Sequence, residues 1–140
     1  MQDVLTFLSN HATLSGSIAI LVVLLLIVEF MRAKRNNFSV SPTQLTQLIN
    51  HQNAAVIDIR SNELYRKAHI IGAHSLQSKE LIDNSKKLEK FKNKPLVIIC
   101  GTGMESQKIT TQLLKRGYNA YALAGGMRAW SDAAMPVVKE

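Results

Sequence analysis

The sequence predicts an α/β domain built on a parallel β-sheet with helices on its faces, preceded by one transmembrane helix. Residues 12–31 form a long apolar stretch, which predicts the transmembrane helix. After residue 38, short apolar runs that suit strands alternate with helical patterns through short connections, which predicts the sheet. In such folds ligands bind outside the carboxyl ends of the strands, so the residues that follow each strand are the first candidates for a site.

The apolar stretch is best explained as a membrane span. Residues 12–28 carry no charge, and Ile18 to Val28 is an unbroken run of eleven apolar residues. A cleaved signal peptide would have a basic first region and a small-residue cleavage site, and neither is visible. A buried core helix would have a polar face, which residues 21–28 lack. We therefore predict a transmembrane helix over residues 12–31.

The distribution of charge predicts the orientation of this helix. All 17 Lys and Arg residues lie at or after Arg32, and the positive-inside rule places such residues in the cytoplasm. Residues 1–11 are then a short extracytoplasmic N-terminus, residues 32–37 a basic linker and residues 38–140 a cytoplasmic domain. We expect a single-pass protein of the inner (cytoplasmic) membrane that contacts membrane lipid.

The first strand and helix of the domain have clear local signals. Residues 38–40 suit an edge strand, and Ser41, Pro42 and Gln44 suit the N-cap, N1 and N3 positions of a helix with a capping box. We expect this helix to end within residues 50–53.

The second strand, residues 54–59, leads into a charged pair. Asp58 and Arg60 lie at its carboxyl end, where such a pair either holds a loop as an ion pair or belongs to a site. We favour the ion pair, because a partly buried carboxylate needs a fixed partner. His69 follows a short helix capped by Ser61, and we interpret it as a hydrogen-bonded structural histidine, since nothing in the sequence makes it a base for Cys100.

Residues 72–94 predict a brief strand after Gly72 and a helix from Ser78 with a break near Asn84. No cofactor is predicted, and no metal, because His69 and His74 lack an established ligand spacing. A lysine cluster precedes Pro95 and suits either a solvated helix face or contact with anionic lipid headgroups. No nucleic acid is expected as a partner, since no recognition motif accompanies the cluster. The lysines of the cluster are Lys86, Lys87, Lys90, Lys92 and Lys94.

The central strand ends at the only cysteine. Residues 96–99 are a short apolar run behind a proline, Cys100 follows, and the glycines at 101 and 103 permit a sharp turn. A helical pattern begins at Ser106 and runs to Arg116. A thiol at such a turn is placed where backbone amides can stabilise its thiolate, although a small buried residue at the end of a core strand is the alternative. In the cytoplasm this cysteine is expected to be a free thiol.

The last strand is predicted over residues 118–123. A turn at Gly125 and Gly126 leads into a final helix that contains Trp130, and Pro136 marks its end. The chain has no internal repeat.

Four segments resemble the rhodanese (sulfurtransferase) family, in order and at that family's spacing. They are VIDIR at 56–60, ELYRKAHIIGA at 63–73, VIICGTGMES at 97–106 and GYNAYALAGGMRAW at 117–130. The resemblance covers residues 38–138, and with the apolar stretch it is similar to the single-domain, membrane-anchored bacterial form. It implies a five-stranded parallel sheet and a catalytic cysteine that accepts sulfane sulfur from thiosulfate or another donor. The resulting persulfide passes its sulfur to a thiol or to cyanide.

Carried over by position, the resemblance makes Cys100 the persulfide carrier. It implies that backbone amides cradle the outer sulfur. Asp58, Arg60 and His69 are interpreted from the sequence alone, as residues that support the fold or the site. Related phosphatases use a longer loop that ends in arginine, whereas here Ser106 is the sixth residue after Cys100, which disfavours phosphoryl chemistry. The residues of the implied binding loop are Gly101, Thr102, Gly103, Met104 and Glu105.

Two positions of this loop depart from the family pattern. Many members carry arginine at the position of Gly101, and arginine or a small polar residue at that of Glu105. A Glu105 carboxylate pointing inward would oppose a nearby thiolate by about 2–3 kcal/mol, whereas one pointing to water would be screened. We therefore expect thiosulfate, a dianion, to be a poor donor.

Two functions stay open at this point. One is a sulfurtransferase whose sulfur donor and thiol acceptor are small molecules or proteins. The other is a non-catalytic rhodanese-like module that engages other inner-membrane proteins. The cysteine and the loop glycines favour the first, and the residues at 101 and 105 favour the second.

Overall fold

The computed structural model describes residues 1–83 and 85–140, four of them (Leu8, Arg35, Asn36 and Ser85) by backbone alone. The chain forms two compact units, residues 1–37 and residues 38–140. The first unit is helical, and the second contains the sheet.

The second unit is an α/β domain around a five-stranded sheet, as the sequence predicts. The strands are β1 (Ser39–Val40), β2 (Ala55–Asp58), β3 (His74–Ser75), β4 (Leu96–Ile99) and β5 (Ala120–Leu123). Their order is β1-β5-β4-β2-β3 and every pair is parallel. β4 is therefore the central strand, and its side chains are buried on both faces, which explains its unbroken apolar sequence.

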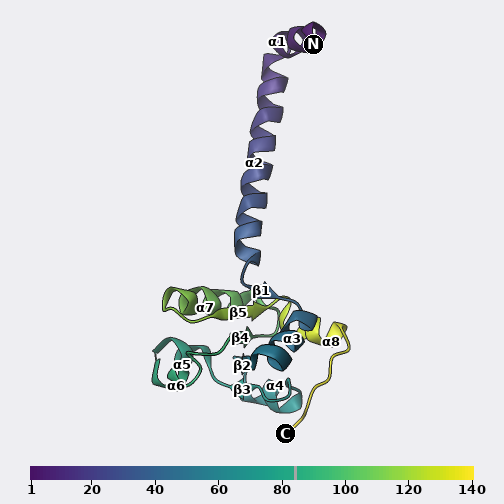
Figure 1. Cartoon of the computed structure of the whole chain (residues 1–140). Coiled ribbons are helices and arrows are strands. Elements are labelled where there is room, and N and C mark those ends of the chain that lie inside the picture. The colour runs from purple at the N-terminus through teal and green to yellow at the C-terminus, as the bar shows by residue number, and fades with distance from the viewer. Residues whose placement is uncertain (84) are drawn as a thin grey trace. The chain divides into compact units, whose positions relative to one another are not determined.

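Helices cover both faces of the sheet (Figure 1). One face carries α5 (Ser78–Asp83), α6 (Ser85–Glu89) and α7 (Met104–Lys115), and the other carries α3 (Pro42–Gln52), α4 (Asn62–Lys67) and α8 (Gly126–Asp132). Alternate residues of β4 feed the two cores: Ile98 belongs to the cluster with Leu113, and Val97 to the cluster with Leu45 and Trp130. This alternation holds the end of β4 between two packed layers.

Local signals account for much of this arrangement. The Ser41 hydroxyl accepts a hydrogen bond from the Gln44 amide, and the Gln44 side chain accepts one from the Ser41 amide, so the predicted capping box is present. α3 ends at Gln52, and its C-cap Asn53 adopts a left-handed conformation. The break expected near Asn84 falls outside the described residues, between the end of α5 and the start of α6.

Some predicted boundaries are wrong. α7 begins at Met104, two residues earlier than predicted, and α8 ends at Asp132, before Pro136. The strand predicted over 118–123 begins at Ala120, because the amide of Tyr118 instead bonds to Leu113 at the end of α7.

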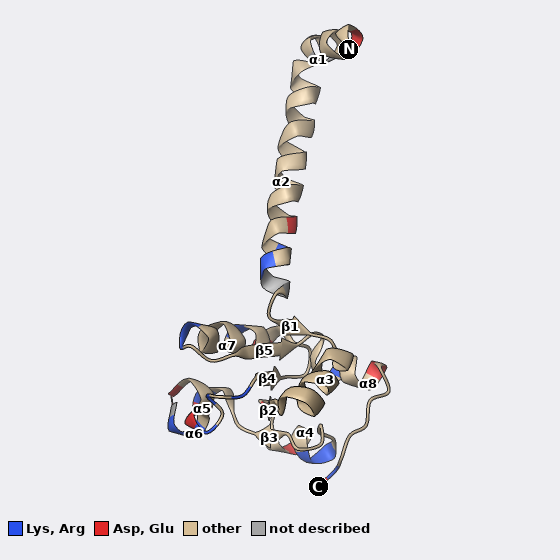
Figure 2. Cartoon of the chain, viewed as in Figure 1, with Lys and Arg blue, Asp and Glu red and all other residues tan. Residues whose placement is uncertain are grey.

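The first unit consists of α1 (Gln2–Asn10) and α2 (Ala12–Asn36). α2 is long and apolar enough over residues 12–34 to cross a membrane. Figure 2 shows its long stretch without charge, followed by acidic and then basic positions. α2 continues to Asn36, through most of the basic linker predicted over residues 32–37, because Arg, Ala and Lys at 32–34 are good helix formers. The division into span and linker stays a prediction.

A candidate active site at the end of β4

Cys100 lies directly after β4, where the chain turns into α7. Cys100 is only 5% exposed, so its thiol is recessed beneath the loop. Gly103 is the N-cap of α7 with φ of 91°, a left-handed conformation that a residue with a side chain rarely adopts. This glycine lets the loop close tightly over the sulfur.

Hydrogen-bonding groups of the loop and of α7 surround the sulfur. The amide of Gly103 donates to Cys100 Sγ at 3.0 Å, and Ser106 Oγ lies 3.4 Å from the same sulfur. The Ser106 hydroxyl itself donates to the carbonyl oxygen of Gly103 at 3.0 Å. Ser106 is fully buried, so this contact is shielded from water.

These contacts change the acidity of the thiol. Burial raises the pKa of Cys100, but hydrogen bonds from the Ser106 hydroxyl and from backbone amides outweigh burial and lower the pKa below its ordinary value. The amides belong to Ser106, Gly103 and Thr102. A cysteine of this kind forms its thiolate more readily than a free one, and the thiolate is the reactive form.

A second glycine turn supports the loop from the side of β5. Gly125, the N-cap of α8, and Gly126 both have positive φ, at 72° and 59°. The amide of Met127 donates to the carbonyl oxygen of Cys100 at 2.9 Å, and that of Arg128 donates to the carbonyl oxygen of Gly101 at 3.2 Å. The start of α8 is thus in direct contact with the loop.

Two loop residues that depart from the family pattern have clear surroundings. A Cβ atom added to Gly101 would meet no atom within 4 Å, so this position is open to solvent. Glu105 is exposed, and its carboxylate accepts a hydrogen bond of 2.5 Å from the hydroxyl of Ser78 at the start of α5. The carboxylate is thereby held by α5.

Asp58, Arg60 and His69 have partners outside the Cys100 loop. Arg60 donates three side-chain hydrogen bonds to the Asp58 carboxylate, the shortest at 2.7 Å, and a fourth to the carbonyl oxygen of Ala68. His69 stacks on Tyr65 with ring centroids 3.9 Å apart, and its Nδ1 lies 2.8 Å from the Tyr65 carbonyl oxygen. These contacts connect the end of β2 to the segment that follows α4.

Ser106 is the site residue that sequence reasoning missed. From the sequence it is identified only as the start of a helix and as the position where a phosphatase would have arginine. The sequence could have identified Ser106, because a hydroxyl in the first turn of the helix after the loop lies within reach of the loop's centre.

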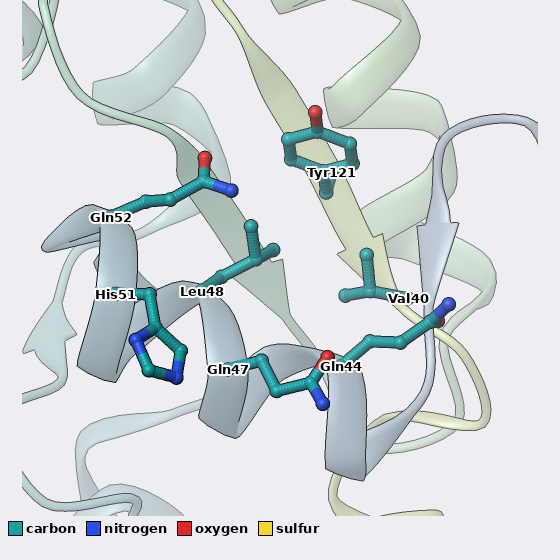
Figure 3. A pocket seen from close by; sticks show the side chains of 7 residues that line it. All are labelled: Val40, Gln44, Gln47, Leu48, His51, Gln52 and Tyr121. Carbon is teal, nitrogen blue, oxygen red and sulfur yellow. The ribbon is translucent and has the colours of Figure 1, made fainter.

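The described residues contain no group of three or more His, Cys, Asp or Glu side chains that could hold a metal ion. They do form an open pocket of about 370 Å³ between α3, β1 and β5, where Val40, Leu48 and Tyr121 lie among amide side chains (Figure 3). None of its lining residues is a predicted site residue. The other lining residues are Gln44, Gln47, His51 and Gln52.

Comparison with known proteins identifies the family. The family model described as "Rhodanese-like domain" matches residues 41–133. The chain belongs to the rhodanese-like family. Its five-stranded parallel sheet agrees with this assignment, as does a solved rhodanese-related protein from Thermoplasma volcanium, with a TM-score of 0.66 and 26% identity over 73% of this chain and 98% of that one.

Curated relatives are similar to this chain at about the same identity. The uncharacterized protein YibN of Escherichia coli (strain K12) is 31% identical over 141 residues, which cover 99% of this chain and 99% of YibN. The thiosulfate sulfurtransferase GlpE of Shewanella oneidensis is 31% identical over 94 residues, 66% of this chain and 91% of GlpE. The likeness to YibN therefore extends through the N-terminal helices, whereas the likeness to GlpE covers a shorter part of the chain.

Proposed function

We propose that this rhodanese-like protein is a sulfurtransferase that carries sulfane sulfur as a persulfide on Cys100. The observation that carries the proposal is the set of hydrogen-bonding groups around one recessed sulfur: the Gly103 amide, which donates to Cys100 Sγ at 3.0 Å, and Ser106 Oγ, which accepts from the thiol at 3.4 Å. The likeness to the thiosulfate sulfurtransferase GlpE supports the same chemistry.

The proposed reaction has two displacements at sulfur. In the first, the Cys100 thiolate attacks the sulfane sulfur of a donor; a new S–S bond forms, the bond from that sulfur to the donor breaks, and the donor leaves with the electron pair. In the second, an acceptor thiolate attacks the outer sulfur, and Cys100 leaves as a thiolate. The amides of the first turn of α7 have no acceptor within their own helix. That of Ser106 already contributes to the hydrogen bonds at the Cys100 sulfur, and we infer that those of Met104 and Glu105 stabilise the negative outer sulfur.

The charges at the loop indicate which class of sulfur donor the site would accept. Gly101 brings no cation to the mouth of the loop, and Glu105 places a carboxylate on the first turn of α7. A dianion such as thiosulfate gains no attraction there. We infer that the donor is a persulfide or polysulfide of lower charge, on a small molecule or on a protein, and that the acceptor is a thiol.

The location of this activity is part of the proposal. An apolar helix over residues 12–34 supports a single-pass anchor in the inner membrane, with residues 1–11 outside and the domain from residue 38 in the cytoplasm. Membrane lipid and other inner-membrane proteins are then its neighbours, and a protein thiol at the membrane is a suitable acceptor.

The experiment is sulfur loading of the full-length protein purified in a mild detergent. The protein is incubated with inorganic polysulfide or with thiosulfate, and mass spectrometry measures whether Cys100 gains the mass of one sulfur atom. We expect loading by polysulfide, weaker loading by thiosulfate, and loss of the added sulfur when a thiol is supplied. Cys100→Ser is the control that should gain nothing.

The result also separates this proposal from the alternative, a rhodanese-like module that only binds partner proteins. Gly101 and Glu105 favour that alternative, since they remove the usual basic groups from the loop. A protein that is folded but takes up no sulfur from either donor would refute the transferase and leave the binding module.

A further inference from the structure

We propose that Gly126, at the start of α8, is a positioning residue for the Cys100 loop: it lets the backbone of α8 approach so closely that the loop can present its amides to the sulfur. The inference deepens the sulfurtransferase proposal and rests on it for its purpose. Its test measures thiolate formation and not sulfur transfer, so that either idea can fail without the other.

The first observation is the closeness of two backbones. A Cβ atom placed on Gly126 would lie 2.3 Å from the carbonyl oxygen of Cys100, and 2.8 Å from both the carbonyl carbon and the oxygen of Gly101. All three are backbone atoms, which cannot move aside as the end of a flexible side chain can. Any residue other than glycine at position 126 must therefore displace the loop that holds the thiol.

The second observation is what this approach achieves. The amide of Met127 donates to the carbonyl oxygen of Cys100 at 2.9 Å, and that of Arg128 to the carbonyl oxygen of Gly101 at 3.2 Å. Both carbonyl groups are thereby held toward α8. A peptide unit whose carbonyl is held on one side directs the N–H of the next residue to the other. The bond to the Gly101 carbonyl therefore orients the amide of Thr102, which is one of the amides that hydrogen-bond to the Cys100 sulfur.

The contact between the Cys100 loop and the start of α8 is also tight at Gly103, on the side of the loop. A Cβ atom on Gly103 would lie 3.0 Å from the nitrogen of Gly125 and 3.2 Å from the carbonyl oxygen of Leu123. Gly103 is the residue whose amide donates to Cys100 Sγ. Two helix N-caps, one for α7 and one for α8, thus lie against each other beside the thiol, and each requires glycine.

Charged side chains near the contact between the two N-caps are exposed, and they do not explain the lowered pKa of Cys100. The charged residues near the starts of the two helices are Glu105 and Lys108 in α7 and Arg128 in α8. Glu105 is bonded to Ser78 of α5, and it is not among the groups that change the pKa of Cys100.

The test compares Gly126→Ala with Gly117→Ala in the full-length protein. Both glycines have positive φ, at 59° and 86°, so alanine is strained at both positions. An added Cβ at Gly117 meets nothing within 4 Å, and this residue follows the far end of α7. The pair therefore differs mainly in contact with the loop.

The measurement is the rate at which iodoacetamide alkylates Cys100 across a range of pH. We expect Gly126→Ala to move the midpoint of the profile upward by about one pH unit, with about a tenfold slower reaction near neutral pH. Gly117→Ala should keep the wild-type midpoint. An unchanged midpoint in a folded Gly126→Ala protein would overturn the proposal, because it would show that the loop amides do not need α8.

A second measurement decides the question if Gly126→Ala fails to fold. Hydrogen exchange of the Met127 and Arg128 amides in the wild-type protein should be as slow as that of amides in β4. Rapid exchange at both positions would mean that the bonds to the loop carbonyls are open in solution, and the proposal would be rejected.

Discussion

The hydroxyl of Ser106 has one proton and two acceptors within reach. With Cys100 protonated, the thiol lies 3.4 Å from Ser106 Oγ while the hydroxyl donates to the Gly103 carbonyl oxygen at 3.0 Å. When the thiolate forms, the hydroxyl can turn and donate to sulfur instead. Ser106 therefore stabilises the charged form through a rotation about one bond, without any movement of the backbone.

Ser106→Ala should raise the pKa of Cys100. The Ser106 hydroxyl is among the groups that lower this pKa, so its loss shifts the thiolate transition to higher pH. Because the alkylation rate follows the thiolate fraction, the rate near pH 7 should fall about threefold to tenfold, while the rate above the transition should be unchanged.

The control is Thr111→Ala, on an exposed part of α7. Thr111 also donates its hydroxyl to the backbone, at the Gln107 carbonyl oxygen 2.9 Å away, but it does not contact sulfur. Iodoacetamide profiles of the two variants decide the matter. Equal profiles for Ser106→Ala and the wild type would contradict the role assigned to the hydroxyl.

Gly101→Arg should make the site more attractive to anions. The position is open, with no atom within 4 Å of an added Cβ, so arginine fits without a backbone shift. One partly screened positive charge near the sulfur is worth about 1 kcal/mol, or about a fivefold rate change. We expect iodoacetate to gain this factor relative to neutral iodoacetamide, and thiosulfate loading to rise in parallel.

Gln52→Arg on α3 is the matched control, since it adds the same charge at an exposed position away from the loop. The ratio of the two alkylation rates should stay at the wild-type value in that variant. Glu105→Arg should act in the same direction as Gly101→Arg. A constant ratio in both loop variants would show that charge at the mouth does not select the donor.

At the scale of elements, sequence reasoning succeeded where a signal is local. Ser41, Pro42 and Gln44 are adjacent residues whose types define a capping box, and the structure contains it. The start of α7 was placed two residues late, because Gly103 has no side chain to mark it as an N-cap. Its role comes from its left-handed conformation and from its contact with Gly125, which is distant in sequence.

The same difference between local and distant signals applies to the site. The position of Cys100 at the end of a central strand could be predicted, since an apolar run followed by glycines is visible in the sequence. The close approach of Gly126 to Cys100 could not, because 26 positions separate the two residues and only the folded sheet brings β4 and β5 together.

The turn after α8 allows a test of backbone strain. Ala134 has φ of 53°, a conformation that favours glycine, and it is exposed. Ala134→Gly should therefore raise the free energy of unfolding by about 0.5–1 kcal/mol. Ala133, its neighbour, has φ of −80°, so Ala133→Gly should lower the same quantity by about 0.5 kcal/mol. Denaturant unfolding measures both, and changes of the same sign would contradict the assignment of strain.

At the scale of the whole molecule, the sequence supplies an apolar helix and an asymmetric charge distribution. α2 has 25 residues, of which those from 12 to 34 can cross a membrane, and the basic residues begin at Arg32. A helix of this length is about 37 Å long, more than the hydrocarbon core of about 30 Å. In the proposed membrane-spanning arrangement, the continuation through Lys34 would therefore extend the basic end of the helix beyond the core, into the region of the lipid headgroups.

This arrangement predicts which parts of the protein a membrane-impermeant maleimide can reach in intact bacterial spheroplasts. In a Cys100→Ser background, single cysteines are placed at two exposed serines, Ser9 in α1 and Ser131 in α8. We expect Ser9→Cys to be labelled in intact spheroplasts and Ser131→Cys to be labelled only after lysis, because the basic residues after the span hold the domain in the cytoplasm. Labelling of Ser131→Cys before lysis would show that the protein has the opposite orientation in the membrane. It would also place Cys100 in an oxidising compartment, where a free persulfide carrier is chemically disfavoured.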